Sequence, residues 1–270
     1  MKTLTLDLTS KCNLNCKYCY VNKKLKDMSF KKIIKLLKQG VKNGFTHLIV
    51  SGGEPLLRRD LIKILKTAKE LKYAIKLNTN GTLITDDFCK KVKDLVDVIQ
   101  VTIDGSKDTH NKLRSKSYDK ALLGLKKIIK HGIKACVATV LSKDTYKEIP
   151  HTIKLCETLG VDYYRLIRLI PHKEELKSKV VTKKMNKLLI KYLKAQNKVK
   201  PKIFYEGICT NNCPAGKEYL GINPDGSIVP CIFYQKIIGK NFKQAQKSDA
   251  LKEILNNPCK GCKALAYYGG

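Results

Sequence analysis

The sequence contains no apolar run of the roughly 18 to 20 residues that cross a bilayer, and it contains no low-complexity tract. Its opening residues, MKTLTLDLTS, alternate apolar and polar side chains as a strand does. With 270 residues, 43% of them hydrophobic, the chain is long enough to bury a core. These features favour a soluble, cytoplasmic protein that has no contact with a membrane.

Acidic residues are scarce: 23 Asp and Glu stand against 54 Lys and Arg, which gives a net charge of +31. Such a charge attracts RNA, acidic peptides or other anions. The lysines are spread over every helical segment instead of forming one stripe, however, so a general preference for lysine explains the charge more simply. The charge alone does not identify a partner.

Cysteine is abundant, with 11 residues, but the odd count argues against a closed set of disulfides, and most cysteines are expected to bind metal. Cys89, Cys136 and Cys156 stand singly among apolar residues, where we expect buried thiols. The others fall into two groups. The first group is Cys12, Cys16 and Cys19, and the second is Cys209, Cys213, Cys231, Cys259 and Cys262.

Short β-rich runs alternate with amphipathic helical segments from residue 3 to residue 170. The expected strands are residues 3–8, 47–51, 74–79, 98–104, 134–141 and 163–170. The expected helices include residues 29–44, 60–72, 118–132 and 146–160, with a further lysine-rich helix over 182–198. This alternation predicts an α/β fold with a parallel sheet and right-handed crossovers, and the strand number favours an open, partial (β/α)6 barrel.

The composition changes near residue 200, beyond which Gly, Pro, Asn and Cys become frequent. Residues 219–231, YLGINPDGSIVPC, predict a hairpin with PDG in its turn. Such a loop-rich segment has little core of its own and usually needs a metal to hold it. We therefore expect two units, a barrel over residues 1–200 and a small, cysteine-rich appendage over residues 201–270.

The first cysteine group has the pattern C-x-x-x-C-x-x-C and directly follows the first expected strand. Its loop is therefore expected at the carboxyl edge of the sheet, where parallel α/β proteins place their sites. Three thiolates can hold three irons of a [4Fe-4S] cluster and leave the fourth iron without a protein ligand, as a site of reaction. A zinc site that borrows a distant fourth ligand is the alternative.

The ends of the next strands carry glycine and polar residues: SGGEPLLRRD at 51–60, NTNG at 78–81 and VTIDGS at 101–106. Together with the cysteine pattern, in this order and over nearly the whole chain, they resemble the radical S-adenosylmethionine (radical SAM) superfamily. The resemblance is specific because the cysteine pattern and GGEP stand on consecutive strand ends, about thirty residues apart.

This resemblance implies a role for each matching residue. The cluster ligands that it implies, with SAM chelating the free iron, are Cys12, Cys16 and Cys19. Gly52, Gly53 and Glu54 match the motif that binds the SAM amino group, since glycine allows close approach and a carboxylate suits an ammonium. The other SAM contacts that it implies are Tyr18 near the adenine, Asn80, Thr102 and Asp104 toward the ribose and methionine, and Arg114 toward the carboxylate.

In such enzymes one electron enters the cluster, SAM is cleaved, and a 5′-deoxyadenosyl radical abstracts a hydrogen atom from the substrate. The cofactor carries this chemistry, while the protein binds, orients and excludes water. The first step needs no acid–base pair, so no catalytic side chain is assigned. The five histidines are expected at helix ends or on the surface.

The second cysteine group resembles the first part of the SPASM domain that follows many radical SAM enzymes. No cysteine follows Cys262, so the further cysteines of a full SPASM domain are missing. What remains is similar to the shorter twitch arrangement, which implies one auxiliary [4Fe-4S] cluster held by Cys213, Cys231, Cys259 and Cys262. Cys209 is either an alternate ligand or a free thiol, and a structural zinc site is the alternative for the group.

The leading hypothesis is a radical SAM iron–sulfur oxidoreductase that modifies a peptide or a small molecule. It requires an external one-electron donor and uses the auxiliary cluster to accept the electron left on the substrate. RNA modification is the alternative within the family, with the charge of +31 as the docking surface. An alternative of another class is a non-catalytic iron–sulfur or zinc scaffold or electron carrier, although a carrier has no use for the SAM pocket that GGEP implies.

Overall fold

The computed structural model describes residues 2–196, 200–206 and 213–256. Within these ranges nine strands form one curved sheet in the order β7-β6-β5-β4-β3-β2-β1-β8-β9. They are β1 Lys2–Asp7, β2 Phe45–Ser51, β3 Ala74–Thr79, β4 Val98–Thr102, β5 Ala135–Leu141, β6 Tyr163–Arg168, β7 Lys202–Glu206, β8 Tyr219–Ile222 and β9 Ile228–Val229. All neighbours are parallel except β8 and β9, which form an antiparallel hairpin.

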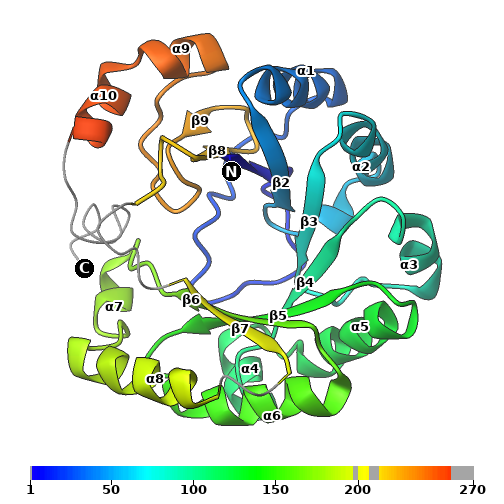
Figure 1. Ribbon diagram of the computed structural model, residues 1–270, viewed down its shortest axis with the longest axis vertical. Helices are drawn as coiled ribbons and strands as arrows, with labels where there is room; N and C mark the ends of the chain where they lie inside the picture. Colours follow the sequence, from blue (N-terminus) through cyan, green and yellow to red (C-terminus); the bar gives the residue numbers. More distant parts are fainter. Residues whose placement is uncertain (1, 197–199, 207–212, 257–270) are drawn as a thin grey trace.

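Helices cover the outer face of this sheet (Figure 1). They are α1 Phe30–Lys42, α2 Leu61–Glu70, α3 Asp86–Val92, α4 Lys107–Leu113, α5 Tyr118–Lys130, α6 Ile149–Leu159, α7 Glu174–Lys177, α8 Lys183–Ala195, α9 Phe242–Lys247 and α10 Asp249–Asn256, with the 3-10 helices η1 Pro55–Leu57 and η2 Tyr146–Glu148. A helix separates each pair of consecutive strands from β1 to β6, which confirms the partial (β/α)6 barrel expected from the sequence. No helix in the described ranges has the length and apolar character needed to cross a membrane.

Helix α1 shows why the helices form where they do. The Ser29 side chain accepts a hydrogen bond from the backbone N–H of Lys32 and so caps the first turn. Residues Ile33, Leu36 and Leu37 recur with helical period and are at most 3% exposed against the sheet. The lysines between them remain on the solvent side, so α1 buries one apolar face and leaves a charged one.

Side chains alternate along each strand between the helix-covered face and the barrel interior. On β1, Leu4 and Leu6 are fully buried in the core between sheet and helices, whereas Asp7 lies on the opposite face. Parallel register places Ser51 beside Asp7 on that inner face. The inner face is therefore more polar than the outer one.

Strands β7 and β8 extend the sheet on both sides of the six expected strands. Strand β7 pairs with β6, and β8 pairs with β1, both in parallel. The hairpin of β8 and β9 is confirmed, and in its turn the Asp225 carboxylate accepts a hydrogen bond of 2.9 Å from the backbone N–H of Ser227. Strand β7 was not expected, because a short run beside Pro201 gives only a weak strand signal. The domain boundary near residue 200 stays a prediction.

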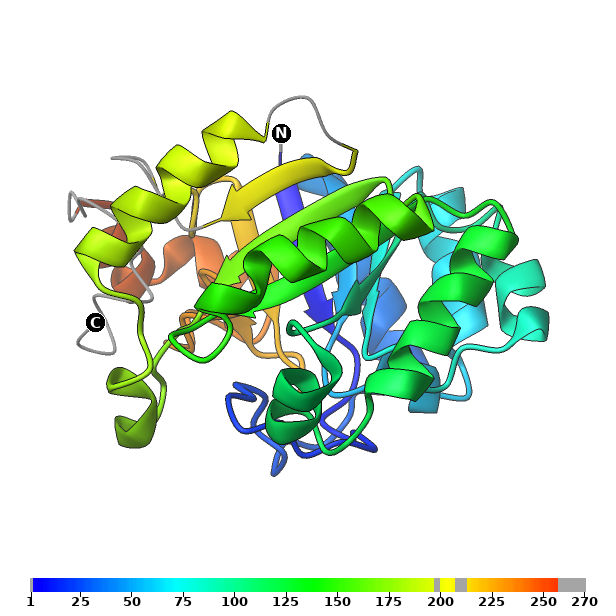
Figure 2. The same cartoon turned by 90° about the horizontal axis from the view of Figure 1, so that it is seen from below.

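The parallel strands share one carboxyl edge, and β1 points toward the lower edge of the molecule in Figure 2. The loop that follows β1 lies at this edge, with α4 beside it. This arrangement places the first cysteine group next to the ends of β2, β3 and β4.

Candidate functional site

The loop between β1 and α1, residues 8–28, carries the first cysteine group, and its first half runs beside the end of β2. Backbone hydrogen bonds continue past the strand ends, from Leu8 N to Ser51 O (2.9 Å), from Gly53 N to Thr9 O (2.7 Å) and from Glu54 N to Lys11 O (2.8 Å). These bonds fix the path of the chain up to the residue before Cys12.

Glycine is required in this contact because the two backbones are too close for a side chain. A Cβ on Gly53 would lie 2.2 Å from the Lys11 carbonyl oxygen, and one on Gly52 would lie 2.6 Å from that of Thr9. Gly52 also has a φ of +128°, a conformation that L side chains rarely adopt. The first two residues of GGEP therefore hold the cysteine loop against β2.

A second set of contacts closes the base of the loop. The Asp27 carboxylate accepts hydrogen bonds from the Thr9 hydroxyl (2.6 Å) and the Ser10 backbone N–H (3.0 Å). The Ser10 hydroxyl donates to the Leu25 carbonyl at 2.7 Å. Both ends of the loop are thus tied together, and the cysteines lie in the part between them.

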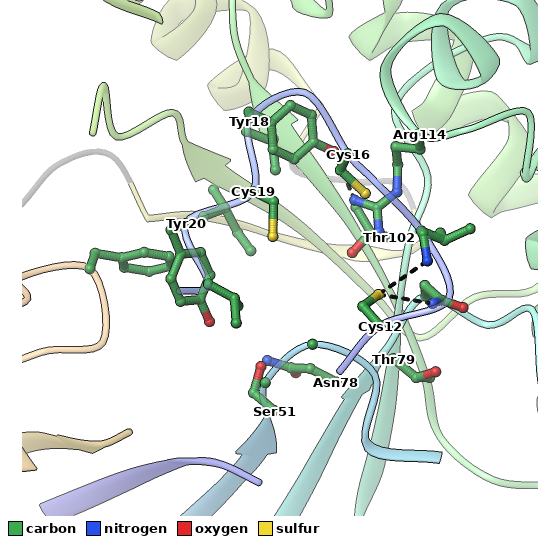
Figure 3. Close-up of a pocket in the computed structure, with 18 of the residues that line it drawn as sticks. Cys12, Cys16, Tyr18, Cys19, Tyr20, Ser51, Asn78, Thr79, Thr102 and Arg114 are labelled. Atoms are coloured by element: carbon green, nitrogen blue, oxygen red, sulfur yellow. Dashed lines mark hydrogen bonds between the residues drawn. The ribbon is translucent and has the colours of Figure 1, made fainter. Parts of the chain in front are cut away.

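Cys12, Cys16 and Cys19 line one pocket at the carboxyl edge, and Figure 3 shows their sulfur atoms turned toward a common space. All three are partly exposed and form no disulfide. Burial raises the pKa of the Cys12 and Cys16 thiols, and the Arg114 charge opposes this rise at Cys16. The structure thus brings the three predicted cluster ligands to one cavity.

Asn80 connects the end of β3 to the cysteine loop. Its amide Nδ2 donates to Asn13 Oδ1 at 2.8 Å and lies 3.9 Å from Cys12 Sγ. Its Oδ1 accepts from both the backbone N–H and the hydroxyl of Thr82, at 2.9 and 2.7 Å. Asn80 lines the pocket, but its hydrogen bonds serve the loop around Cys12.

The Glu54 carboxylate is fully buried and does not line the pocket. It accepts hydrogen bonds from the backbone N–H groups of Leu56 (3.1 Å) and Asn80 (2.8 Å) and from the Thr79 hydroxyl (2.8 Å). These bonds join the ends of β2 and β3. The side chain is therefore placed to organise the site, while the backbone of Gly52 and Gly53 faces the cavity.

Tyr18, Asp104 and Arg114 form one buried cluster. The Tyr18 hydroxyl donates to Asp104 and accepts from Arg114 Nη1 at 2.8 Å, and Arg114 lies 3.7 Å from the Asp104 carboxylate. Burial raises the pKa of Asp104, although Arg114 and Tyr18 oppose the rise. Tyr18 and Arg114 line the pocket, whereas Asp104 is 0% exposed behind them and also accepts from Val140 N–H at 2.8 Å. Asp104 is thus placed to orient Arg114 and Tyr18.

His110 lies in the last turn of α4, as expected of a histidine at a helix end, but it is buried instead of facing solvent. It is 0% exposed inside α4, where Nδ1 accepts from the Asp104 backbone N–H at 3.2 Å and Nε2 lies 3.0 Å from the Ser117 hydroxyl. Burial lowers its pKa to about 3, so the ring is neutral. It joins α4 to the end of β4.

The inner faces of the strands supply further pocket residues, to most of which the motifs assigned no role. Thr102, a predicted site residue, lines the pocket together with Ser51, Asn78 and Gln100, and Arg168 comes from the end of β6. Asn78 and Gln100 are register partners on β3 and β4. Because side chains alternate between the two faces of a strand, the expected strand positions could have indicated which residues face the barrel interior.

Tyr20 and Phe233 form the side of the pocket nearest the C-terminal segment. Their rings make an edge contact with centroids 5.1 Å apart. The Tyr20 hydroxyl lies 3.5 Å from Asp7. Burial raises the pKa of Tyr20 well above its ordinary value, and the nearby Asp7 carboxylate raises it further. The Cys19 and Cys231 thiols act on it in the same direction. Tyr20 therefore lies between the two cysteine groups.

The described residues include two of the predicted C-terminal ligands, Cys213 and Cys231. Both are partly exposed. A hydrogen bond of 3.0 Å from Gly216 N–H to the Pro230 carbonyl holds their two segments side by side. Cys209, Cys259 and Cys262 lie outside the described residues, so the full predicted set stays a prediction.

A family model described as the radical SAM superfamily matches residues 6–156, which is more than half of the chain. The chain belongs to the radical SAM superfamily. A second model, SPASM, described as an iron–sulfur cluster-binding domain, matches residues 213–264. The short length of this match agrees with a truncated SPASM or twitch-type domain.

Solved radical SAM structures share the fold over most of the chain. Streptococcus suis SuiB bound to precursor peptide SuiA has a TM-score of 0.77 at 19% identity and covers 97% of this chain and 70% of that one. Native anSMEcpe with bound AdoMet and Kp18Cys peptide has a TM-score of 0.76 at 18% identity and covers 97% of this chain and 89% of that one. At these identities the likeness establishes the fold.

Relatives of this radical SAM chain are named for different reactions. Pre-heme d1 synthase of Dinoroseobacter shibae is 31% identical over 171 residues, which cover 61% of this chain and 42% of that protein. The probable GTP 3′,8-cyclase of Methanococcus maripaludis is 31% identical over 186 residues, 66% of this chain and 62% of that protein. The chain thus spans less than two thirds of the length of these relatives. GTP 3′,8-cyclase of Aliarcobacter butzleri is 27% identical, over 95% of this chain and 88% of that protein.

The residues of the pocket fit the cofactors of a radical SAM enzyme, a [4Fe-4S] cluster and SAM. Within the described ranges, no three Cys, His, Asp or Glu side chains come close enough to hold one metal ion. A [4Fe-4S] cluster offers a separate iron to each thiolate, which suits three cysteines that line one cavity. Arg114 Nε and Asn78 Oδ1, on two residues of the pocket, are buried and lack hydrogen-bond partners, as groups that meet a polar ligand would.

Proposed function

We propose that this chain cleaves S-adenosylmethionine reductively and uses the resulting radical to remove a hydrogen atom from a peptide or a small molecule. An auxiliary [4Fe-4S] cluster in the C-terminal segment then completes a net oxidation. One observation carries the proposal: a single pocket is lined both by Cys12, Cys16 and Cys19 and by Phe233, two residues after Cys231. A substrate in this pocket would lie between the two cysteine groups.

The chain's own residues would divide the work at the SAM end of the pocket. When bound, the cluster and SAM together supply the electron transfer and the 5′-deoxyadenosyl radical. Gly52 and Gly53 present backbone to the cavity without side chains, and Arg114 presents a cation for the SAM carboxylate. Asn80 holds the loop around Cys12 in place. Glu54 and Asp104 support these groups from behind the pocket wall.

The other end of the pocket suits a substrate with both polar and apolar parts. Ser51, Asn78 and Gln100 present hydrogen-bonding groups, whereas Ile167 and Phe233 present apolar surface. The structures of SuiB and anSMEcpe contain bound peptides, and the GTP 3′,8-cyclases are named for a small molecule. Peptides and small molecules are therefore both retained as the substrate class.

The C-terminal cysteines would have a different task. With Cys213, Cys231, Cys259 and Cys262 as ligands, every iron of the auxiliary cluster would be held by the protein. Such a closed cluster has no vacant position for substrate and is suited to accepting an electron. Tyr20 and Phe233 would separate it from the SAM site and form one wall of the substrate space.

Anaerobic reconstitution tests the proposal. The protein is loaded with iron and sulfide, then incubated with dithionite and SAM, and 5′-deoxyadenosine is measured by chromatography. We expect deoxyadenosine and about eight irons per chain. An absence of deoxyadenosine from a loaded protein would refute the enzyme proposal. An iron content of about four per chain would refute only the auxiliary cluster.

A further inference from the structure

The reaction proposed above consumes one electron for each SAM cleaved, and an external donor must deliver it to the first cysteine group. Electron transfer slows steeply with distance, so the donor must approach the loop that carries these cysteines. We propose that the exposed face of this loop, together with the end of α4, docks an acidic electron-carrier protein of the ferredoxin type. This inference rests on the proposed function.

The loop lies beside α4 at the carboxyl edge (Figure 2). The Lys17 backbone N–H donates to the Leu113 carbonyl at 3.0 Å, and the Asn15 N–H donates to the Ser115 hydroxyl at 3.0 Å. The cysteines of the loop are partly exposed. A protein that covers this surface would therefore reach the cluster site without entering the barrel.

The surface is positively charged and has few negative groups. We call this surface the cysteine-loop face and define it by its seven exposed lysines, which are Lys11, Lys17, Lys23, Lys24, Lys26, Lys112 and Lys116. Residues 8–26 contain neither Asp nor Glu, and the carboxylate of Asp27 is already bonded to Thr9 and Ser10. In the described part of the chain, none of the seven ammonium groups forms an ion pair. An acidic partner would neutralise this charge and be steered toward the face.

The observations favour a protein over RNA as the occupant. Proteins that bind single-stranded nucleic acid offer aromatic side chains for base stacking. The two tyrosines of this loop, however, direct their hydroxyls inward, Tyr18 to Asp104 and Tyr20 to Asp7. Two arginines hydrogen-bond to this loop, Arg58 to the Leu8 and Met28 carbonyls and Arg114 to the Tyr18 hydroxyl. Both side chains are only 10% exposed, so neither offers its guanidinium for bidentate contact with phosphate. The exposed charged groups of this face are therefore lysines, which attract a negatively charged protein surface but do not recognise bases.

The redox step itself is simple. One electron would pass from the reduced carrier to the cluster that Cys12, Cys16 and Cys19 would hold, with no bond made or broken in the protein and no proton transferred. The oxidised carrier then dissociates. Charge attraction that is moderate and sensitive to salt suits such a short-lived complex.

Two triple variants of the holoenzyme with the same change of charge test the proposal. The first, K24E/K26E/K112E, reverses part of the cysteine-loop face. The matched control, K184E/K187E/K191E, reverses exposed lysines on α8, which lies at the opposite edge in Figure 2. Both sets consist of exposed side chains without ion pairs in the described ranges, so both variants are expected to fold and to load iron normally.

The primary measurement is the dissociation constant of an oxidised plant-type ferredoxin, by calorimetry at low and moderate salt. We expect the cysteine-loop variant to bind at least about tenfold more weakly at low salt, and the α8 variant to stay within about threefold of the original chain. The difference should shrink as salt increases. Unchanged binding by the cysteine-loop variant, or equal weakening in both variants, would overturn the proposal.

A second measurement separates docking from catalysis. SAM cleavage is driven either by reduced ferredoxin or by reduced methyl viologen, a small cation that the lysines do not attract. The cysteine-loop variant should lose ferredoxin-driven cleavage and keep viologen-driven cleavage. No cleavage with viologen in the original chain would refute the proposed function, while the ferredoxin affinities would still test the docking surface. If bulk tRNA displaces ferredoxin and loses affinity only for the cysteine-loop variant, the face belongs to RNA and the proposal is wrong.

Discussion

Replacing Gly53 with alanine adds one methyl group where the chain has no room for it. The new Cβ would lie 2.2 Å from the Lys11 carbonyl oxygen, whereas ordinary contacts begin at 3.4 Å. The two backbones must therefore separate by about 1 Å, which strains packing that does not yield easily. This separation loosens the 2.8 Å hydrogen bond from Glu54 N–H to Lys11 O and shifts the neighbouring Cys12.

The expected cost of Gly53→Ala is about 2 to 4 kcal/mol, from overpacking together with one weakened hydrogen bond. For a chain of this size, that corresponds to a fall in melting temperature of about 5 to 15 °C. Because the strained contact adjoins Cys12, iron should fall from about eight to about four per chain. Deoxyadenosine formation with dithionite should fall at least about tenfold, since the displaced ligand leaves the SAM site without its cluster.

Gly132→Ala is the matched control. Gly132 has a φ of +70°, and a Cβ added there would meet nothing within 4 Å, so alanine costs backbone strain of about 1 kcal/mol without a clash. It should lower the melting temperature slightly and leave the iron content unchanged. If Gly53→Ala retains full iron and full cleavage, close packing of GGEP does not position the cysteine loop. Equal iron loss in both variants would attribute the effect to general instability.

Four further variants test the two cysteine groups and the buried carboxyls. Cys16→Ala should abolish SAM cleavage, whereas Cys231→Ala should leave some cleavage and block product formation; equal loss of deoxyadenosine would mean that the second group is only structural. Burial raises the pKa of Asp7 from 3.8 to about 8, so the native apoprotein holds a proton that the unfolded chain releases. The free energy of unfolding should therefore fall as pH rises from about 4 to about 8, by up to about 1.4 kcal/mol per pH unit. Urea unfolding of Asp7→Asn should lack this part of the pH dependence. An identical pH dependence in Asp7→Asn would show that Asp7 is not the group responsible. Asp104→Asn should cost about 3 to 5 kcal/mol in urea unfolding, because it leaves the buried charge of Arg114 without its carboxylate; a loss below about 1 kcal/mol would contradict the pairing.

The sequence predicted the barrel well because each of the first six strands is a short β-rich run followed by an amphipathic helix. It also predicted that the strand-end motifs would meet, since parallel strands bring their carboxyl ends to one edge. The roles of individual side chains were harder to predict. Glu54 and Asp104 are examples: the structure buries both carboxylates behind the pocket wall and bonds them to the protein, and their contact with SAM stays a prediction. Motif spacing places a residue on a loop, but it does not reveal which donors will surround its side chain.

Other features of the site depend on contacts between distant segments. Phe233 reaches the pocket because β8 pairs with β1, and no local pattern in the sequence indicates that pairing. The same reason applies to Tyr20, which is near both Cys19 and Cys231 because β8 pairs with β1. The SAM-binding residues and the C-terminal ligand set stay predictions that the experiments above can decide.

The pairing of β1 with β8 also sets an order of assembly during synthesis. Strand β1 is synthesised before β2, its partner on one edge, and its other edge has no partner until residues 219–222 emerge. Because unpaired strand edges invite wrong association, the nascent barrel carries one vulnerable edge through most of translation. The cysteine loop can therefore close at its base while the Phe233 side of the cavity is still open.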